Sequence, residues 1–347
     1  MPDLAGVLAA LTAALMWTLS SMLWGRIQVT AFVLNAAKNS IGLVLILLHL
    51  AAISLFLPDY NALERIPNLD GRAWGWLFFS ALSGIVVGDT FFFRSLQILG
   101  PRRALIVACF SPLFATVLGV LFADQILNVI VMTGIFMTMS GVIAVVTDRR
   151  AEAEAPGLMP GSFASGVACG ITAAACQAIG GLCSKNGMEF CLPIEATLIR
   201  LAVATAASGL ALAIFRKKNR TPVHNLFSWK LARFLVPATA IGTWLGIWFS
   251  QISYSSQIDL AVIQTLLSTC PLFAIPIVWL VYGHKPNRLA IVGTVIAIFG
   301  IWLSVSGEAR QPTQDTNSDR HGSWQLQSEG IGEPNPIQKS TTPVDDA

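Results

Sequence analysis

The pentapeptide SPLFA at residues 111–115 returns as CPLFA at residues 270–274, displaced by 159 residues. Small residues elsewhere keep step with this displacement to within one residue. The further matches are Gly134 with Gly293, Gly141 with Gly300, GIVVG at 84–88 with GTWLG at 242–246, and AGV at 5–7 with SGV at 165–167. Because chance similarity between apolar segments does not readily give a series of matches in register, we interpret the chain as an internal duplication.

The composition indicates that lipid surrounds most of the chain. Of the 347 residues, 54% are hydrophobic and 12% are charged, whereas soluble proteins have about 25% charged residues. The net charge of +3, together with the lack of basic stretches interleaved with aromatic residues, argues against a nucleic-acid partner.

Ten apolar runs are long enough to cross a membrane as helices, which takes about 20 residues each. Because lipid offers no partner to backbone polar groups, these runs predict an all-α integral membrane protein. The runs lie near residues 4–24, 30–57, 73–98, 103–123, 126–147, 162–184, 192–215, 232–257, 259–282 and 286–306.

Each half of the duplication holds five runs, which is an odd number. The second half therefore enters the membrane from the opposite face, and we expect ten transmembrane helices as two inverted five-helix repeats. Such repeats are a transporter architecture, with the substrate site near the membrane midplane between the halves. The expected organisation is a first repeat (4–147), a linker (148–161), a second repeat (162–306) and a disordered polar tail (307–347).

The two halves also resemble a known family. Each runs from a proline-bearing helix (SPLFATVLGVLF, 111–122; CPLFAIPIVWLVYG, 270–283) into a glycine-marked last helix (GIFMTMSGVIAV, 134–145; GTVIAIFGIWLSV, 293–305). This order is similar to that of the EamA domains of the drug/metabolite transporter superfamily. The resemblance implies a multi-pass protein of the plasma membrane, the inner membrane in a bacterium.

Four charged residues fall inside apolar runs, where a charge costs about 2.5–3.5 kcal/mol at a helix centre. Lys38 and Asp89 lie at similar depths, roughly 12–14 Å from the same interface, so they can meet. Arg200 occupies the position in the second half that corresponds to Lys38, but GTWLGIWFSQISY offers no acid to match Asp89, which leaves Glu195, five residues away and close to the interface, as its one candidate partner in the membrane. An unpaired cation in a cavity attracts an anionic group. Arg94 lies nearer the interface, where it can snorkel.

Other side chains could line a cavity between the halves: Trp17, Gln177, Trp244, Gln251 and Gln264. Taken alone, each of these is better explained by packing or by a hydrogen bond between helices. Lys38 and Asp89 have an alternative interpretation too, as a buried structural pair that fixes two helices, and Arg200 is explained equally well by a structural role. Cys169, Cys176 and Cys183 recur every seven residues, which we interpret as a small-residue packing seam, so we expect neither a metal site nor a cofactor.

Lysine and arginine near the helix ends predict the orientation. Four such cations lie on the side of the N-terminus and thirteen on the other side, which we expect to be cytoplasmic, with both termini outside. The family resemblance favours the opposite orientation. The four are Arg65, Arg72, Lys185 and Arg310, and the thirteen are Arg26, Arg102, Arg103, Arg149, Arg150, Arg216, Lys217, Lys218, Arg220, Lys230, Arg233, Lys285 and Arg288.

The leading functional hypothesis is a secondary transporter that exports small polar metabolites, either amino acids or related organic anions and zwitterions. The chain has no Walker A motif and no HExxH or GxSxG motif, so we expect neither ATP hydrolysis nor an enzyme. The alternatives are an exporter of drugs or organic cations, and a receptor-like or structural membrane protein. The expected partners are a small-molecule substrate, the lipid bilayer, a coupling proton or ion and a second copy in a homodimer.

Overall fold

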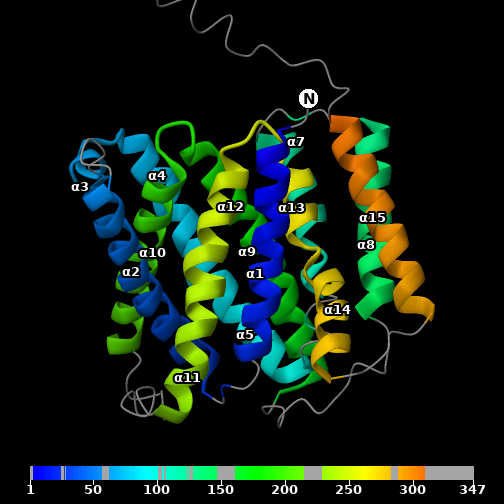
Figure 1. The fold of residues 1–347 in the computed structure, drawn as a ribbon, viewed down its shortest axis with the longest axis horizontal. Coiled ribbons are helices and arrows are strands. Elements are labelled where there is room, and N and C mark those ends of the chain that lie inside the picture. Colours follow the sequence, from blue (N-terminus) through cyan, green and yellow to red (C-terminus); the bar gives the residue numbers. More distant parts are fainter. Residues whose placement is uncertain are drawn as a thin grey trace, which may run out of the picture. The chain divides into compact units, whose positions relative to one another are not determined.

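The computed structural model describes residues 3–24, 27, 29–56, 62–100, 104, 107–122, 125, 128–146, 161–214, 229–282 and 288–308. All regular structure in these ranges is helical, as expected (Figure 1). The described helices belong to one compact unit, Met1–Ala309. The expected linker falls almost entirely outside the described residues, and so does the expected tail beyond Glu308.

The helices of the first half are α1 (Leu4–Trp24), α2 (Ala31–Phe56), α3 (Ala62–Arg65), η1 (Ile66–Asn68), α4 (Gly71–Ser80), η2 (Ala81–Gly88), α5 (Asp89–Leu99), α7 (Ser111–Phe122) and α8 (Val129–Val146). Those of the second half are α9 (Phe163–Gly187), α10 (Pro193–Ile214), α11 (Trp229–Ala238), η5 (Thr239–Leu245), α12 (Gly246–Tyr254), α13 (Leu260–Leu267), α14 (Cys270–Tyr282) and α15 (Arg288–Glu308).

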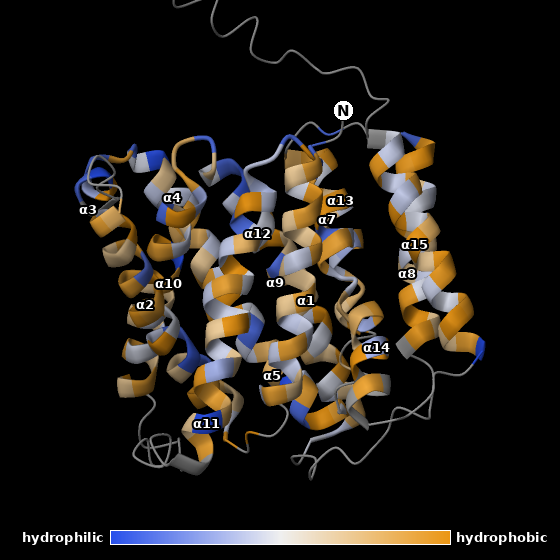
Figure 2. Cartoon of the chain, viewed as in Figure 1, coloured by the Kyte–Doolittle hydropathy of each residue, from blue (hydrophilic) through white to orange (hydrophobic). Residues whose placement is uncertain are grey.

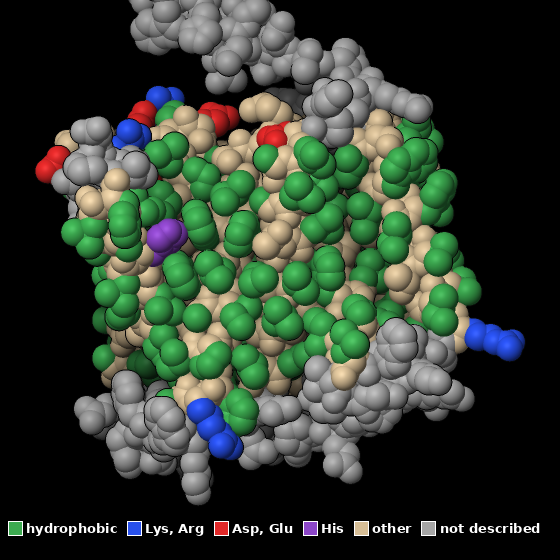
Figure 3. All heavy atoms as spheres, viewed as in Figure 1, with side chains coloured by type: hydrophobic (Ala, Val, Ile, Leu, Met, Phe, Trp, Pro, Cys, Tyr) green, Lys and Arg blue, Asp and Glu red, His purple; other side chains and the backbone are tan. Residues whose placement is uncertain are grey.

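Eight helical segments of the described chain are long and apolar enough to cross a membrane. The apolar helices α7 and α8 fall short of that length criterion. On the face shown in Figure 3, hydrophobic side chains cover the flank of the molecule, while Lys, Arg, Asp and Glu side chains lie toward its two ends. Hydrophobic residues predominate along most of the helices (Figure 2). The chain is therefore a multi-pass membrane protein.

The fourth apolar run of each half is a broken helix, which corrects the expectation of continuous spans over 103–123 and 259–282. A turn at Cys109–Phe110 precedes α7, and Ser268–Thr269 separate α13 from α14. The same backbone bond closes both turns, from the N–H of Phe110 to Val107 O at 3.1 Å and from that of Thr269 to Leu266 O at 3.2 Å. A proline at the second position of α7 and of α14 explains the break, because it has no N–H to donate and its ring would clash with the carbonyl four residues earlier if the helix continued through it.

The third apolar run of each half contains a π-helix, η2 in the first half and η5 in the second. The two begin 158 residues apart, the displacement that relates the glycines of GIVVG and GTWLG. Stretches of π-helix are rare, and they often lie at functional sites.

The third runs of the two halves point in opposite directions. In Figure 1, α4 lies at the upper end of the molecule and α5 at the lower end, whereas α11 lies at the lower end and α12 at the upper end. Helices α4, η2 and α5, which follow one another without a gap, pack against α9 of the second half. In this interface the Ser80 hydroxyl donates to Gly180 O at 2.7 Å. The η5 helix packs reciprocally against α1 of the first half.

Helices α8 and α15 pack side by side through glycines (Figure 1). A methyl group added at Gly134 would lie 2.7 Å from Gly300 O, and one at Gly293 would lie 2.7 Å from Gly141 O. The glycine pairs that are related by the duplication therefore meet across one helix interface, and they let the two backbones approach closely.

Local sequence sets several helix starts. The Asp70 carboxylate accepts a hydrogen bond from the N–H of Arg72 at 2.8 Å and begins α4, and the Ser162 hydroxyl accepts one from the N–H of Ser165 to begin α9. Hydrogen bonds from the Arg72 side chain lower the pKa of the Asp70 carboxyl. A side-chain oxygen at the position before the helix satisfies backbone donors that have no partner inside the helix.

Most cations that support the orientation argument lie outside the described residues: Arg26, Arg102, Arg103, Arg149, Arg150, Arg216, Lys217, Lys218, Arg220, Lys285 and Arg310. The orientation therefore stays a prediction.

Candidate functional site

A cavity of about 180 Å³ lies between the two halves. On the same measure a single water needs about 10–15 Å³, so a small solute fits. Both broken helices contribute to its wall, through Cys109 and Ser111 in the first half and Ser268, Cys270 and Pro271 in the second. Discontinuous helices of this kind build substrate sites in other transporters with inverted repeats.

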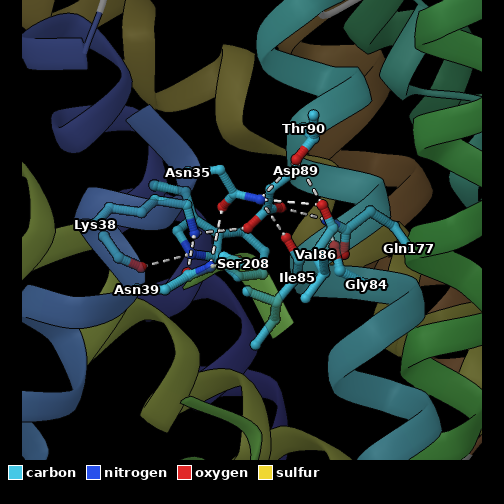
Figure 4. A network of polar contacts seen from close by, with 12 residues as sticks. Asn35, Lys38, Asn39, Gly84, Ile85, Val86, Asp89, Thr90, Gln177 and Ser208 are labelled. Atoms are coloured by element: carbon cyan, nitrogen blue, oxygen red, sulfur yellow. Dashed lines mark hydrogen bonds and ion pairs between the residues drawn. The ribbon is translucent and has the colours of Figure 1, made fainter. Parts of the chain in front are cut away.

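Lys38 and Asp89 form an ion pair in this cavity (Figure 4). Lys38 Nζ donates to Asp89 Oδ2 at 2.8 Å, and the Lys38 side chain is only 2% exposed. The same nitrogen donates to Asn39 Oδ1 at 3.0 Å, while Gln177 Nε2 donates to Asp89 Oδ1 at 2.8 Å. The prediction that Lys38 and Asp89 can meet is thus confirmed. Together with Gln177, these two residues join helices α2, α5 and α9.

Asn35 connects this pair to the π-helix of the first half (Figure 4). Its Nδ2 donates to Ile85 O at 2.8 Å, to Val86 O at 3.1 Å and to Thr90 Oγ1 at 2.8 Å. The wider turn of η2 leaves backbone carbonyls available to side chains. Asn35, Lys38 and Asn39 share one face of α2 because they are spaced three and four residues apart.

The two π-helices are each contacted by a side chain from the opposite half. Trp17 Nε1 donates to Gly242 O in η5 at 2.9 Å, and Gln177 Nε2 approaches Gly84 O in η2 at 3.4 Å. Gln177 lies 160 residues after Trp17, and Gly242 lies 158 after Gly84. The two contacts are therefore equivalent under the duplication, although their chemistry differs.

Arg200 lies in the same cavity but has no counter-ion there. It is 6% exposed, and within the described part of the chain it makes no hydrogen bond or ion pair, with its Nε–H buried and unsatisfied. A methyl group at Gly84 would lie 3.4 Å from Arg200 Nη2, so the guanidinium group lies against η2. Asp89 attracts it electrostatically from beyond ion-pair distance.

Glu195, which precedes Arg200 by five residues, is engaged elsewhere. It is fully buried, its Oε1 accepts from Arg65 Nε at 2.8 Å, and its Oε2 accepts from the N–H of Leu192 at 2.9 Å. The carboxylate thus starts α10 and ties it to the end of α3.

The cavity brings together six of the nine side chains that the sequence suggested: Trp17, Lys38, Asp89, Gln177, Arg200 and Gln264. The other three do not line it. Arg94 lies further along α5, Trp244 donates to His49 Nδ1 at 3.4 Å, and Gln251 accepts from the Ser184 hydroxyl at 3.1 Å.

Sequence reasoning missed several residues of the wall. Trp24, Thr243 and Tyr254 line the cavity, and Asn35 and Asn39 support its ion pair. Asn35 and Asn39 could have been predicted from the NAAKN stretch at 35–39, because it places three polar residues on one face of an apolar helix. Trp24, Thr243 and Tyr254 carry no such signal, since their neighbours in space come from distant segments.

The wall can bind a small charged or polar molecule without covalent chemistry. It combines one ion pair, one uncompensated cation, several amide and hydroxyl groups and the aromatic rings of Trp17, Trp24 and Phe93. Among the described residues, no group of three or more His, Cys, Asp or Glu side chains is placed to hold a metal ion.

Comparison with known proteins gives one family. The model of the EamA-like transporter family matches the chain twice, over residues 3–147 and 164–306. A comparison with curated proteins finds no match. One solved structure, described as a crystal structure of a protein, is 18% identical with a TM-score of 0.65, and the alignment covers 88% of this chain and 98% of that one. At this identity the likeness shows the fold alone.

Proposed function

The chain belongs to the EamA-like transporter family, a family of membrane transporters in the drug/metabolite transporter superfamily, and on that premise we propose that it is a secondary exporter of small polar metabolites. The proposed substrates are amino acids or related organic anions and zwitterions. The proposed architecture is ten crossings of the plasma membrane in two inverted five-helix repeats, which exchange access to the central cavity by rocking against each other.

The observation that carries this proposal is the cavity between the halves with Lys38, Asp89 and Arg200 in its wall. Charged groups inside membrane-spanning helices are costly, and they usually mark substrate or ion pathways. The two-fold match of the family model supports the repeat, and the opposed directions of α4–α5 and α11–α12 support its inversion (Figure 1).

The sequence has no Walker A motif for ATP, so the proposed energy source for coupled transport is an ion gradient. Asp89 is the proposed coupling group. Its carboxylate is 21% exposed and shares its two oxygens between Lys38 and Gln177, so protonation would release Lys38 and weaken the contact between α2 and α5.

The test is substrate counterflow in proteoliposomes that contain the purified full-length protein. The panel holds amino acids, organic acids and quaternary amines, and Asp89→Asn is compared with the wild type in the presence and absence of a pH gradient. Asp70→Asn is the matched control, since it removes a carboxylate that is exposed and lies outside the cavity.

We expect saturable exchange of amino acids or organic acids, with Asp89→Asn losing either exchange or its response to pH. Exchange that Asp89→Asn leaves unchanged would reduce Asp89 to a structural role. Exchange of quaternary amines alone would replace the proposal with a cation exporter. No exchange of any solute by folded protein would favour the receptor-like reading.

A further inference from the structure

The duplication relates the ion pair of the first half to an incomplete pair in the second. Helix α2 begins 162 residues before α10, and Lys38 precedes Arg200 by the same interval. In the third run, where the displacement is 158, the residue equivalent to Asp89 is Ile247. Both Arg200 and Ile247 line the cavity. The second half therefore keeps the cation and lacks the acid.

The charges of the wall do not balance. Lys38 and Asp89 compensate each other at 2.8 Å, and the described wall contains no other carboxylate. Arg200 is left with one positive charge, and the residue is only 6% exposed. Burying a charge without a partner is unfavourable, because the charge loses its hydration and gains no counter-charge in return. A bound anion would offset that cost.

Two more unsatisfied polar atoms lie in the same wall. Trp24 Nε1 and Thr243 Oγ1 are buried without a hydrogen-bond partner in the described chain, as is Arg200 Nε, and all three side chains line the cavity. Trp24 packs on η5, where a methyl group at Gly242 would lie 2.8 Å from its Cη2. Thr243 follows directly in the same π-helix. Buried polar groups are rarely left without partners unless a ligand or water supplies them.

We propose that the carboxylate of the substrate completes the second half, by taking beside Arg200 the place that Asp89 takes beside Lys38. The guanidinium group binds the carboxylate in a charge-assisted, bidentate manner, and the Trp24 and Thr243 side chains are further hydrogen-bonding groups of the same wall. This inference rests on the proposed transport function and adds the substrate class, which is monocarboxylates, including amino acids.

The decisive variant is Ile247→Asp, because it inserts the missing acid and should compete with the substrate for Arg200. Ile247→Asn has nearly the same size and no charge, so it separates charge from shape. Arg200→Gln removes the cation itself. Arg72→Gln removes a cation that is exposed and outside the cavity, and it serves as the control for charge loss.

Binding is measured as stabilisation of the purified protein against heat, which does not require transport, and exchange is measured by counterflow. The probes are L-leucine with L-leucinamide, L-threonine with L-threoninamide, and lactate with lactamide, so each carboxylate is paired with its uncharged amide group. We expect carboxylates to stabilise the wild type more than their amides do. Ile247→Asp and Arg200→Gln should each weaken carboxylate binding about tenfold or more, with a smaller loss for Ile247→Asn and none for Arg72→Gln.

The inference is overturned if amides bind as well as carboxylates, or if folded Ile247→Asp binds carboxylates as the wild type does. Should Ile247→Asp fail to fold, an unchanged carboxylate preference in Arg200→Gln overturns it equally. Carboxylate-dependent stabilisation without any exchange would refute the transport function and leave the anion site intact. Exchange of amides at the rate of carboxylates would refute the anion site and leave transport intact.

Discussion

At the scale of single residues, the two buried cations show how the same position is used in two ways. Lys38 has its charge matched by Asp89 and a further bond to Asn39. Arg200 has neither kind of contact within the described chain. A lysine donates along a flexible stem, whereas an arginine presents a planar fork that suits a carboxylate. The residue types are therefore consistent with a fixed pair on one side and ligand binding on the other.

Asp89→Asn should destabilise the protein, because it leaves the buried Lys38 ammonium without a counter-charge. We expect a loss of about 3–5 kcal/mol in the free energy of unfolding. The double variant Lys38→Met/Asp89→Leu should recover most of this loss, since it removes both charges. Unfolding of the purified proteins in detergent measures both effects, and an Asp89→Asn protein as stable as the wild type would contradict the expectation.

At the scale of elements, the π-helices and the broken helices fall at matching places in the two halves and meet at the cavity. Each π-helix presents a glycine carbonyl to a side chain of the other half. Because both halves share this arrangement, we attribute it to the duplicated fold. The two halves differ in the side chain that makes the contact, which is Trp17 in one and Gln177 in the other.

Alanine substitutions at the equivalent glycines of the π-helices should differ in effect. A methyl group at Gly242 would lie 2.5 Å from Ser20 Cβ, whereas one at Gly84 would have its nearest neighbour, Arg200 Nη2, at 3.4 Å. We expect Gly242→Ala to cost about 1–3 kcal/mol of stability through overpacking. Gly84→Ala should leave stability near the wild type while crowding Arg200, so it should weaken carboxylate binding. Equal destabilisation by the two variants in thermal unfolding would show that the two helices are packed alike.

The glycine seam between α8 and α15 should be sensitive to a single methyl group. At Gly141 the added carbon would lie 2.5 Å from Ala297 N and 2.8 Å from Ala297 Cβ, whereas nothing lies within 4 Å at Gly209 on α10. Gly141→Ala should therefore lower the thermal unfolding midpoint. Gly209→Ala should hold or raise it, since alanine in an open helix position gains about 0.5–1 kcal/mol over glycine. The reverse order would mean that the seam does not stabilise the fold.

At the scale of the whole molecule, the duplication accounts for the architecture and the departures from it account for the site. The matched features are the broken helices, the π-helices and the glycine seam. The unmatched ones are Asp89 against Ile247 and Trp17 against Gln177. The cavity therefore lies between equivalent halves that carry unequal charges.

The orientation in the membrane is also a prediction at this scale. With thirteen cations on one side and four on the other, we expect both termini to face away from the cytoplasm. A phosphatase fused after Ala347 should then be active in a bacterial host, and a fluorescent protein at the same point should stay dark. A bright fluorescent fusion with an inactive phosphatase would place the C-terminus in the cytoplasm and contradict the prediction.

Much of the fold could be predicted from the sequence, because it depends on local patterns of residues. The length of the apolar runs predicted the helices, and the glycine and proline spacing predicted the duplication. The breaks at Cys109–Phe110 and Ser268–Thr269 were missed, although Pro112 and Pro271 mark them, because hydropathy does not register a change in backbone geometry. The two π-helices were missed for the same reason.

The sequence by itself determined that lipid surrounds the chain, that the fold is helical and that it contains a repeat. It also showed that charged residues lie inside the apolar runs, where contact with lipid would be unfavourable. Only the tertiary structure decided which of those charges are compensated, because a side chain is paired or unpaired according to what distant helices place beside it. Lys38 meets Asp89 across 51 residues, Glu195 meets Arg65 across 130, and Arg200 meets no carboxylate at bonding distance in the described chain.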